Sequence, residues 1–260
     1  MTHTFKGESM HCDVSYKENL DKLRVRIRAH REFANFDVSD WIEDHVAKKP
    51  RRAIFDLGCG NGNHLGIYLA HVGRAGRVVG LDREPSLLDD ARRRFGAPQL
   101  ELEVGSMDEP LPFPDASFDL CLSNFAIYNA RDPRFTIGEL RRVLQPGGEI
   151  VLIGPTHRNA RELHEFNARL TGQAVDEMIL IRSDRIRREI SPIVLDVFGN
   201  ASEEILSSRL AFPSADEFVR YFQSTLFYER IEGVSREQML AAVPRDLVVS
   251  KEMVAAMAAR

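Results

Sequence analysis

Two spacings of apolar residues alternate along most of the chain. Short, mainly apolar runs are typical of buried strands, and longer stretches with apolar residues near every third or fourth position predict helices. We expect strands at 53–57, 78–82, 100–104, 117–123, 149–153 and 203–210, and a last strand within 247–259. We expect helices at 17–36, 39–47 (opened by a Ser39 cap), 65–72, 85–95, 136–144, 159–171, 176–190, 214–225 and 236–243. This alternation predicts an α/β fold with a doubly wound, mostly parallel seven-stranded sheet.

The most distinctive stretch is 56–62, Asp-Leu-Gly-Cys-Gly-Asn-Gly, which joins the first expected strand to a helix. Glycines at alternate positions let the backbone turn sharply and leave no Cβ atoms to hold a ligand away. A strand, a glycine turn and a helix N-terminus together form a cofactor platform in doubly wound sheets. An ordinary turn could use glycine for its geometry alone, but three glycines directly after Asp-Leu favour a ligand site.

The spacing also bears on the kind of cofactor. The dinucleotide fingerprint requires Gly-x-Gly-x-x-Gly, but here Asn63 occupies the sixth position. The second strand ends in Asp82, whose carboxylate can accept hydrogen bonds from two ribose hydroxyls. The pattern therefore fits a nucleoside and does not require a pyrophosphate.

These residues resemble the class I S-adenosylmethionine-dependent methyltransferases. A second stretch, 140–148 (Leu-Arg-Arg-Val-Leu-Gln-Pro-Gly-Gly), resembles that family's helix and turn before the fifth strand. The Pro and Gly residues of this stretch end a helix, and the stretch has no catalytic role of its own. The resemblance covers about 52–155 and is closest to the ubiquinone and menaquinone methyltransferases. It implies a Rossmann-like fold and S-adenosylmethionine as cofactor, with N-terminal helices and a helical cap after strand five.

The resemblance also implies a set of cofactor-binding residues. In the family, the loop after the third strand holds adenine, with an apolar side chain beside the ring and a carboxylate at its exocyclic amine. Met107 suits the first role and Asp108 the second, although the family often has its acid where this chain has Ser106. Asp108 could instead cap the loop. The full cofactor-binding set is Asp56, Gly58, Cys59, Gly60, Asn61, Asp82, Arg83, Met107, Asp108, Asn124, Phe125 and, as a lid residue, Tyr16.

Two residues are candidates for the acceptor side. His157 follows the fifth strand and could act as a general base if the acceptor is a hydroxyl or a protonated amine. Tyr128 follows the fourth strand and could face the acceptor. Either residue could be purely structural. The Asn-Pro-Pro-Tyr signature of amide-methylating enzymes is absent from 123–126, which weakens DNA-adenine or glutamine methylation.

Composition narrows the class of protein further. With 260 residues, 43% of them hydrophobic, the chain can bury a core. A net charge of -4 argues against a general nucleic-acid binder. Cys12, Cys59 and Cys121 are too widely spaced for a disulfide framework or a metal site, and no signal or membrane segment is apparent. We expect a cytoplasmic protein, a monomer or homodimer, that uses no metal and acts on a small molecule.

The chain is expected to form one integrated domain. Residues 1–50 would form a helical lid, 51–155 and 203–260 the cofactor-binding core, and 156–202 an acceptor-side cap. Arginines are frequent in the first helix and in the cap, where they could meet an anionic partner or simply face water. Two other functions stay open: an NAD-type oxidoreductase on a similar sheet, and a non-catalytic module that binds S-adenosylmethionine.

Overall fold

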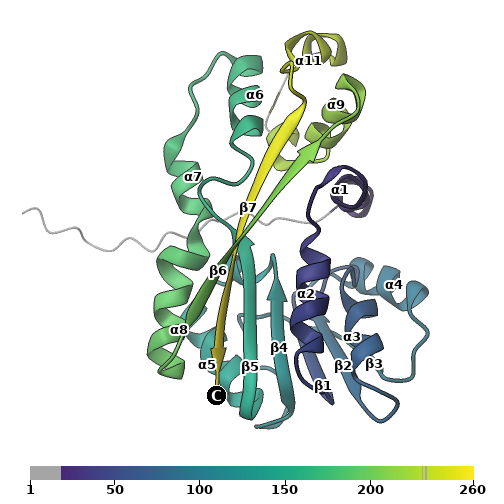
Figure 1. Cartoon of the computed structure of the whole chain (residues 1–260), viewed down its shortest axis with the longest axis vertical. Helices are drawn as coiled ribbons and strands as arrows, with labels where there is room; N and C mark the ends of the chain where they lie inside the picture. The colour runs from purple at the N-terminus through teal and green to yellow at the C-terminus, as the bar shows by residue number, and fades with distance from the viewer. Residues whose placement is uncertain (1–18, 230, 232) are drawn as a thin grey trace, which may run out of the picture.

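A computed structural model describes residues 19–229, 231 and 233–260. Its seven strands form one sheet in the order β3-β2-β1-β4-β5-β7-β6 (Figure 1). The first five in this order are parallel, and β7 runs antiparallel to β5 and β6. The strands are β1 (Ala53–Leu57), β2 (Arg77–Asp82), β3 (Leu100–Val104), β4 (Phe118–Asn124), β5 (Leu144–Pro155), β6 (Ser202–Ala211) and β7 (Val248–Ala259). The predicted doubly wound, mostly parallel seven-stranded sheet is confirmed.

The strand order reverses at β1, since β2 lies on one side of it and β4 on the other. In such sheets ligands bind outside the carboxyl ends of the strands, at this switch point. The carboxyl ends of β1, β2 and β4 are where the sequence places Asp56, Asp82 and Asn124. The topology therefore brings the polar ends of three strands to one edge of the sheet.

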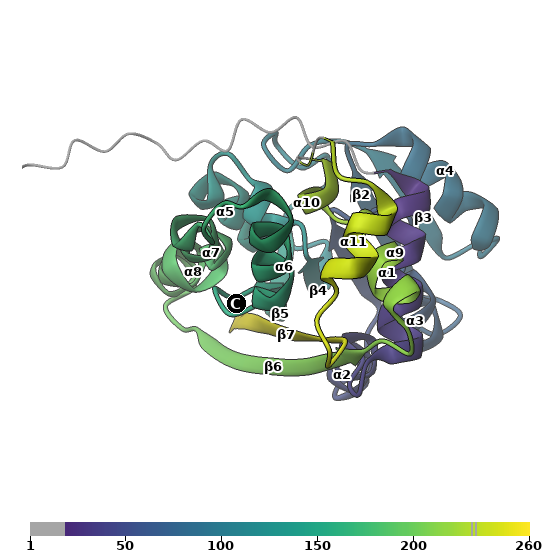
Figure 2. The same ribbon diagram turned by 90° about the horizontal axis from the view of Figure 1, so that it is seen from above.

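Helices cover both faces of the sheet and form a layer above its carboxyl edge (Figures 1 and 2). Among the described helices, none is long and apolar enough to cross a membrane. They are α1 (Leu20–Phe33), α2 (Val38–Ala47), α3 (Leu65–His71), α4 (Pro85–Arg94), η1 (Ile127–Asn129), α5 (Pro133–Val143), α6 (Arg161–Thr171), α7 (Glu177–Ser183), η2 (Ile186–Ile190), α8 (Ser191–Phe198), α9 (Ala215–Gln223), α10 (Leu226–Glu229) and α11 (Arg236–Ala242).

Strand β1 is buried on both faces, which explains its nearly continuous apolar sequence. Phe55 and Leu57 point to one face and join a core cluster with Ile137 of α5. Ile54 points to the other face and joins a cluster with Ile42 of α2. All of these side chains are fully buried. Two separate cores therefore fix β1, and with it the turn that follows.

Strands β6 and β7 continue past the carboxyl end of β5 as a two-stranded ribbon. Residue Pro155, the last of β5, pairs with Met253, whereas β7 already begins at Val248, paired with Ala211 of β6. A third core cluster joins this ribbon to α6, α9, α11 and part of α1. The helices between β6 and β7 thus pack against α6 above the sheet (Figure 1).

Several helix boundaries differ from the predicted ones. Helix α2 is capped by Asp37, whose side chain accepts from the Ser39 N–H, so the predicted Ser39 cap is wrong. Asp37 also offers a side-chain oxygen as acceptor, and it lies two residues before Ser39, directly before the first helical residue, Val38. Helix α5 begins three residues before the predicted start, at Pro133, with Asp132 as its cap. The stretch 176–190 contains α7 and the π-helical turn η2, and α8 beyond it was not predicted.

Candidate cofactor and acceptor site

The glycine turn lies at the carboxyl end of β1, against the segment that follows β4. Gly58 has a φ of +77°, and a Cβ atom there would lie 2.3 Å from the Cβ of Ala126. Its N–H donates to the carbonyl of Leu81 at 2.7 Å, which ties the turn to β2. Gly60 also has a positive φ, +55°, but a Cβ atom there would meet only Leu87, at 3.9 Å. Close packing therefore excludes a side chain at Gly58, while Gly60 borders open space.

Asp82 sits at the end of β2 and connects the glycine turn to the next loop. Its Oδ2 accepts from the N–H of Gly60 at 2.8 Å, and its Oδ1 accepts from the N–H of Glu84 at 2.9 Å. Burial raises the pKa of Asp82, although these two backbone donors act to lower it. Each carboxylate oxygen retains a second lone pair, so Asp82 can still accept from two hydroxyl groups.

Asp56, Asn124 and Tyr68 form a buried polar group below the turn. The Asn124 amide donates to the Tyr68 hydroxyl at 2.7 Å. Oδ1 of Asp56 and Oδ1 of Asn124 are buried and have no hydrogen-bond partner among the described residues. Burial, with a smaller effect from the Asp82 charge, raises the pKa of Asp56 to about 8. Buried oxygens without a donor are uncommon, and a pair of them fits a ligand that brings N–H groups, such as an ammonium.

The loop after β3 places Met107 over the glycine turn. A Cβ atom on Gly58 would lie 3.6 Å from Met107 Cε. The Met107 carbonyl accepts from the Thr136 hydroxyl at 2.9 Å. Asp108 accepts from the Arg131 N–H at 2.7 Å through Oδ1. Asp108 thus binds the segment between η1 and α5, and its contact with adenine stays a prediction, as does that of Met107.

The segment after β4 carries local backbone strain. Phe125 has a φ of +57°, uncommon for a residue with a side chain, and its N–H donates to the carbonyl of Ile153 at 2.8 Å. Such strain persists where the surrounding structure enforces it and is concentrated at ligand sites. Tyr128 is half-buried against the core beneath α5, and its carbonyl accepts from Arg185 at 2.7 Å. Contacts of Phe125 and Tyr128 with cofactor or acceptor stay predictions.

Other predicted cofactor residues lie in less direct positions. The Cys59 side chain is buried beside Gly80, so only its backbone is available to a ligand at the turn. The Asn61 amide points to Asp90 on α4, at 3.5 Å. Arg83 is exposed next to Asp82. Tyr16 lies outside the described residues.

His157 lies apart from these groups, in the turn between β5 and α6. Its Nδ1 is 2.8 Å from Oδ2 of Asp184, a buried carboxylate that precedes η2. The imidazole is 41% exposed and lines a pocket of about 610 Å³ together with residues such as Arg158 and Arg209. The register places His157 four residues beyond Ile153, which pairs with Asn124. A histidine oriented by a buried carboxylate is suited to accept a proton at its other nitrogen.

Two side chains of this arrangement were not predicted from the sequence. Tyr68 is one of the apolar positions of α3, where a hydroxyl gives no sign of its partner. Asp184 lies in a charged stretch, where no spacing marks it as the partner of His157. Such pairs come from strands and helices distant in sequence, so no local pattern reveals them.

Arg24 and Arg31 of α1 are exposed to solvent, but the arginines of this helix also bond within the chain. Each of four is bonded within the chain. Their partners are Asp90 for Arg24, the Ser224 carbonyl for Arg26, Glu217 for Arg28 and Asn63 for Arg31. Helix α1 therefore connects the glycine-turn side of the sheet, through Asp90 and Asn63, to α9 above the sheet.

Comparison with known proteins agrees with this geometry. Residues 55–152 match the family described as "Methyltransferase domain". A 2-phytyl-1,4-naphtoquinone methyltransferase from Trichormus variabilis is 31% identical over 65% of this chain and 76% of its own length. A demethylmenaquinone methyltransferase from Thermus thermophilus is 40% identical over 42% of this chain and 49% of its own. The chain spans 44% to 62% of the length of five curated relatives that it matches.

Solved structures show the same fold at low sequence identity. A putative methyltransferase from Bacillus halodurans aligns with a TM-score of 0.60 and 14% identity, over 85% of this chain and 97% of that one. The fold, the glycine turn and the sequence relatives agree. The chain belongs to the class I S-adenosylmethionine-dependent methyltransferases.

Proposed function

We propose that this protein transfers a methyl group from S-adenosylmethionine to an O, N or C atom of a small metabolite. The observation that carries the proposal is the pair of unpartnered buried oxygens on Asp56 and Asn124, close to the glycine turn. Together with Asp82, they offer acceptors for an ammonium and for ribose hydroxyls at one edge of the sheet. S-adenosylmethionine has both kinds of donor, the ammonium in its methionine part and the hydroxyls on its ribose.

The chain's residues would mainly bind and orient the reactants. When bound, the cofactor supplies a methyl group on a positively charged sulfur, which an acceptor atom attacks as the carbon–sulfur bond breaks and S-adenosylhomocysteine leaves. Holding the acceptor in line with that bond and excluding water can supply ~7–11 kcal/mol of the barrier. An activated carbon or a neutral amine needs no base in the protein.

For a hydroxyl or protonated amine acceptor, His157 is the proposed general base. Asp184 would hold the Nδ1–H of the imidazole and leave Nε2 to take the acceptor's proton. Tyr128, in the segment after β4, is the second proposed acceptor-side residue. Both proposals depend on the acceptor reaching the end of β5.

The acceptor is proposed only as a class. Relatives are named for demethylmenaquinone, for 2-phytyl-1,4-naphtoquinone and for malonyl-[acyl-carrier protein]. The family match ends at residue 152, before the cap that would contact an acceptor. We therefore propose a small-molecule acceptor without naming one, and a cytoplasmic monomer or homodimer acting on neither nucleic acid nor membranes.

Calorimetric titration tests the proposal. S-adenosylmethionine and S-adenosylhomocysteine should bind the purified, ligand-free protein, and NAD should not. Asp82→Ala should abolish binding of both, while Asp89→Ala, which removes an exposed carboxylate on α4, should leave it unchanged. NAD binding alone would support an oxidoreductase instead. Binding without methyl transfer to any compound in a metabolite panel would support a non-catalytic module.

A further inference from the structure

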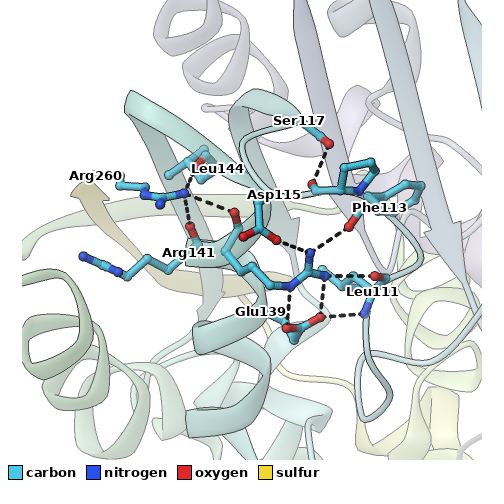
Figure 3. A network of polar contacts seen from close by, with 10 residues as sticks. Leu111, Phe113, Asp115, Ser117, Glu139, Arg141, Leu144 and Arg260 are labelled. Carbon is cyan, nitrogen blue, oxygen red and sulfur yellow. Dashed lines mark hydrogen bonds and ion pairs between the residues drawn. The ribbon is translucent and has the colours of Figure 1, made fainter.

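Helix α5, which leads directly into β5, holds a loop of the proposed cofactor site. Arg142 lies in the last turn of α5, within the stretch whose sequence shows only a helix ending. Its guanidinium donates to the carbonyl oxygens of Phe113 and Leu111, at 2.8 and 2.9 Å. It also donates to Asp115 at 2.9 Å. Figure 3 labels Asp115, Leu111 and Phe113 in this network. One side chain thus binds three residues of the segment between β3 and β4.

Two further residues of α5 hold the same segment. Glu139 accepts from the Leu111 N–H at 2.8 Å, and both of its carboxylate oxygens also accept from Arg142, at 2.7 and 2.8 Å. Thr136 donates to the Met107 carbonyl at 2.9 Å. Met107, Leu111 and Phe113 are therefore each bonded through the backbone to α5.

These contacts fix a segment with no regular structure of its own. Between the end of β3 at Val104 and the start of β4 at Phe118 the chain forms only turns and bends. A planar guanidinium can bind a carboxylate and carbonyl groups in several directions at once, which a lysine ammonium on its flexible stem cannot do with the same geometry. The pKa of Glu139 is lowered, chiefly by its hydrogen bond with Arg142, so the pair stays charged near neutral pH.

We propose that Arg142 is a positioning residue for recognition of the adenine ring, acting through this segment on Met107 and Asp108. The inference rests on the proposed function, which places adenine at these two residues. Asp108 precedes Leu111 by three residues, and its Oδ1 is held by the Arg131 N–H. Its Oδ2 lies 3.8 Å from Nε of Arg131, too far for a hydrogen bond, and can therefore accept one from the exocyclic amine of the ring. Without Arg142, the segment would no longer hold that oxygen in place.

A pair of ligands and a matched pair of variants test this role. The ligands are S-adenosylhomocysteine and S-inosylhomocysteine, which differ in the exocyclic amine that Asp108 would bind. The variants are Arg142→Gln and Arg141→Gln, which remove the same charge from adjacent positions. The exposed side chain of Arg141 points away from the segment in Figure 3. Affinity is measured by calorimetry, and unfolding is followed by circular dichroism.

We expect the wild type and Arg141→Gln to prefer the adenosyl ligand equally. Arg142→Gln should lower the affinity for the adenosyl ligand about tenfold, or roughly 1.4 kcal/mol, and leave the affinity for the inosyl ligand nearly unchanged. If Arg142→Gln does not fold, Thr136→Val, which frees the Met107 carbonyl, should reduce the same preference. An unchanged preference in a folded variant would overturn the inference even if the melting temperature falls. A wild type that binds neither ligand would instead contradict the proposed function.

Discussion

The guanidinium of Arg24 on α1 donates to the carboxylate of Asp90 on α4 at 2.8 Å. Only 4% of the Asp90 side chain is exposed, whereas 54% of the Arg24 side chain is. Asp90 also meets Arg93 at 3.3 Å and the Asn61 amide at 3.5 Å. A single buried carboxylate therefore joins the N-terminal helix to the glycine turn.

Asp90→Asn should destabilise the protein by about 1–3 kcal/mol, because three donors lose a charged acceptor at a buried position. Arg24→Ala should lower the free energy of unfolding by less, since Arg93 and Asn61 still donate to the Asp90 carboxylate. Urea unfolding measures both changes. Asp89→Ala, on the exposed side of the same helix, is the control and should stay within about 0.5 kcal/mol of the wild type. An equal decrease in the free energy of unfolding in all three variants would contradict a special role for Asp90.

Alanine substitution at three glycines should separate folding from ligand binding. Gly60 and Gly73 have similar positive φ angles, +55° and +67°, with room for a Cβ atom at both. Each alanine should therefore cost about 1 kcal/mol of stability through backbone strain alone. Only Gly60→Ala should weaken S-adenosylhomocysteine binding, because only this turn faces the proposed cofactor. Gly58→Ala should be destabilised by several times more, because of its 2.3 Å approach to Ala126.

Calorimetry and thermal unfolding on the same three variants check this prediction. Loss of binding in Gly73→Ala, in the turn between α3 and β2, would show that backbone strain outside the glycine turn is sufficient. Normal binding in Gly60→Ala would place the cofactor away from the turn.

The sheet could be predicted from the sequence because its signals are local. In β1 a nearly continuous apolar run follows from burial on both faces, and the glycines at 58 and 62 adopt positive φ as the turn demands. The same holds for Asp82, whose place at the end of β2 follows from where the apolar run stops. These features need only neighbouring residues to be recognised.

The contacts that complete the site are not local. Tyr68 and Asn124 are 56 residues apart in sequence, and His157 and Asp184 are 27 apart. The arginines of α1 and Arg142 of α5 look like ordinary charges on helices, and only the fold shows their partners. The packing of α9 and α11 against α6 likewise joins segments distant in sequence, which no local pattern reveals.

The buried carboxyl group of Asp56 should make stability depend on pH. Burial, assisted by Asp82, raises its pKa from 3.8 to about 8, so the folded state holds a proton that the unfolded state releases at lower pH. The contribution of Asp56 to the free energy of unfolding is complete below about pH 4. It is lost as the pH rises to 8, and the free energy of unfolding falls by at most about 1.4 kcal/mol per pH unit. Unfolding of the ligand-free protein between pH 5 and pH 9 measures the slope. Asp56→Asn should flatten the curve over this range, and an unchanged slope would show that Asp56 does not titrate there.

His157→Ala and Asp184→Asn should separate catalysis from cofactor binding. Because Asp184 contacts Nδ1 of His157 at 2.8 Å, Asp184→Asn should leave the imidazole in place but weaken it as a base. For a hydroxyl acceptor found by screening, His157→Ala should lower kcat by about 10²–10⁴ and Asp184→Asn by less. S-adenosylhomocysteine affinity should stay unchanged in both variants, which steady-state kinetics and calorimetry check together. Arg158→Gln, an exposed neighbour in the same pocket, is the control. If both variants keep full kcat with such an acceptor, the pocket beside β5 does not contain the base, and His157 serves only to hold the buried Asp184.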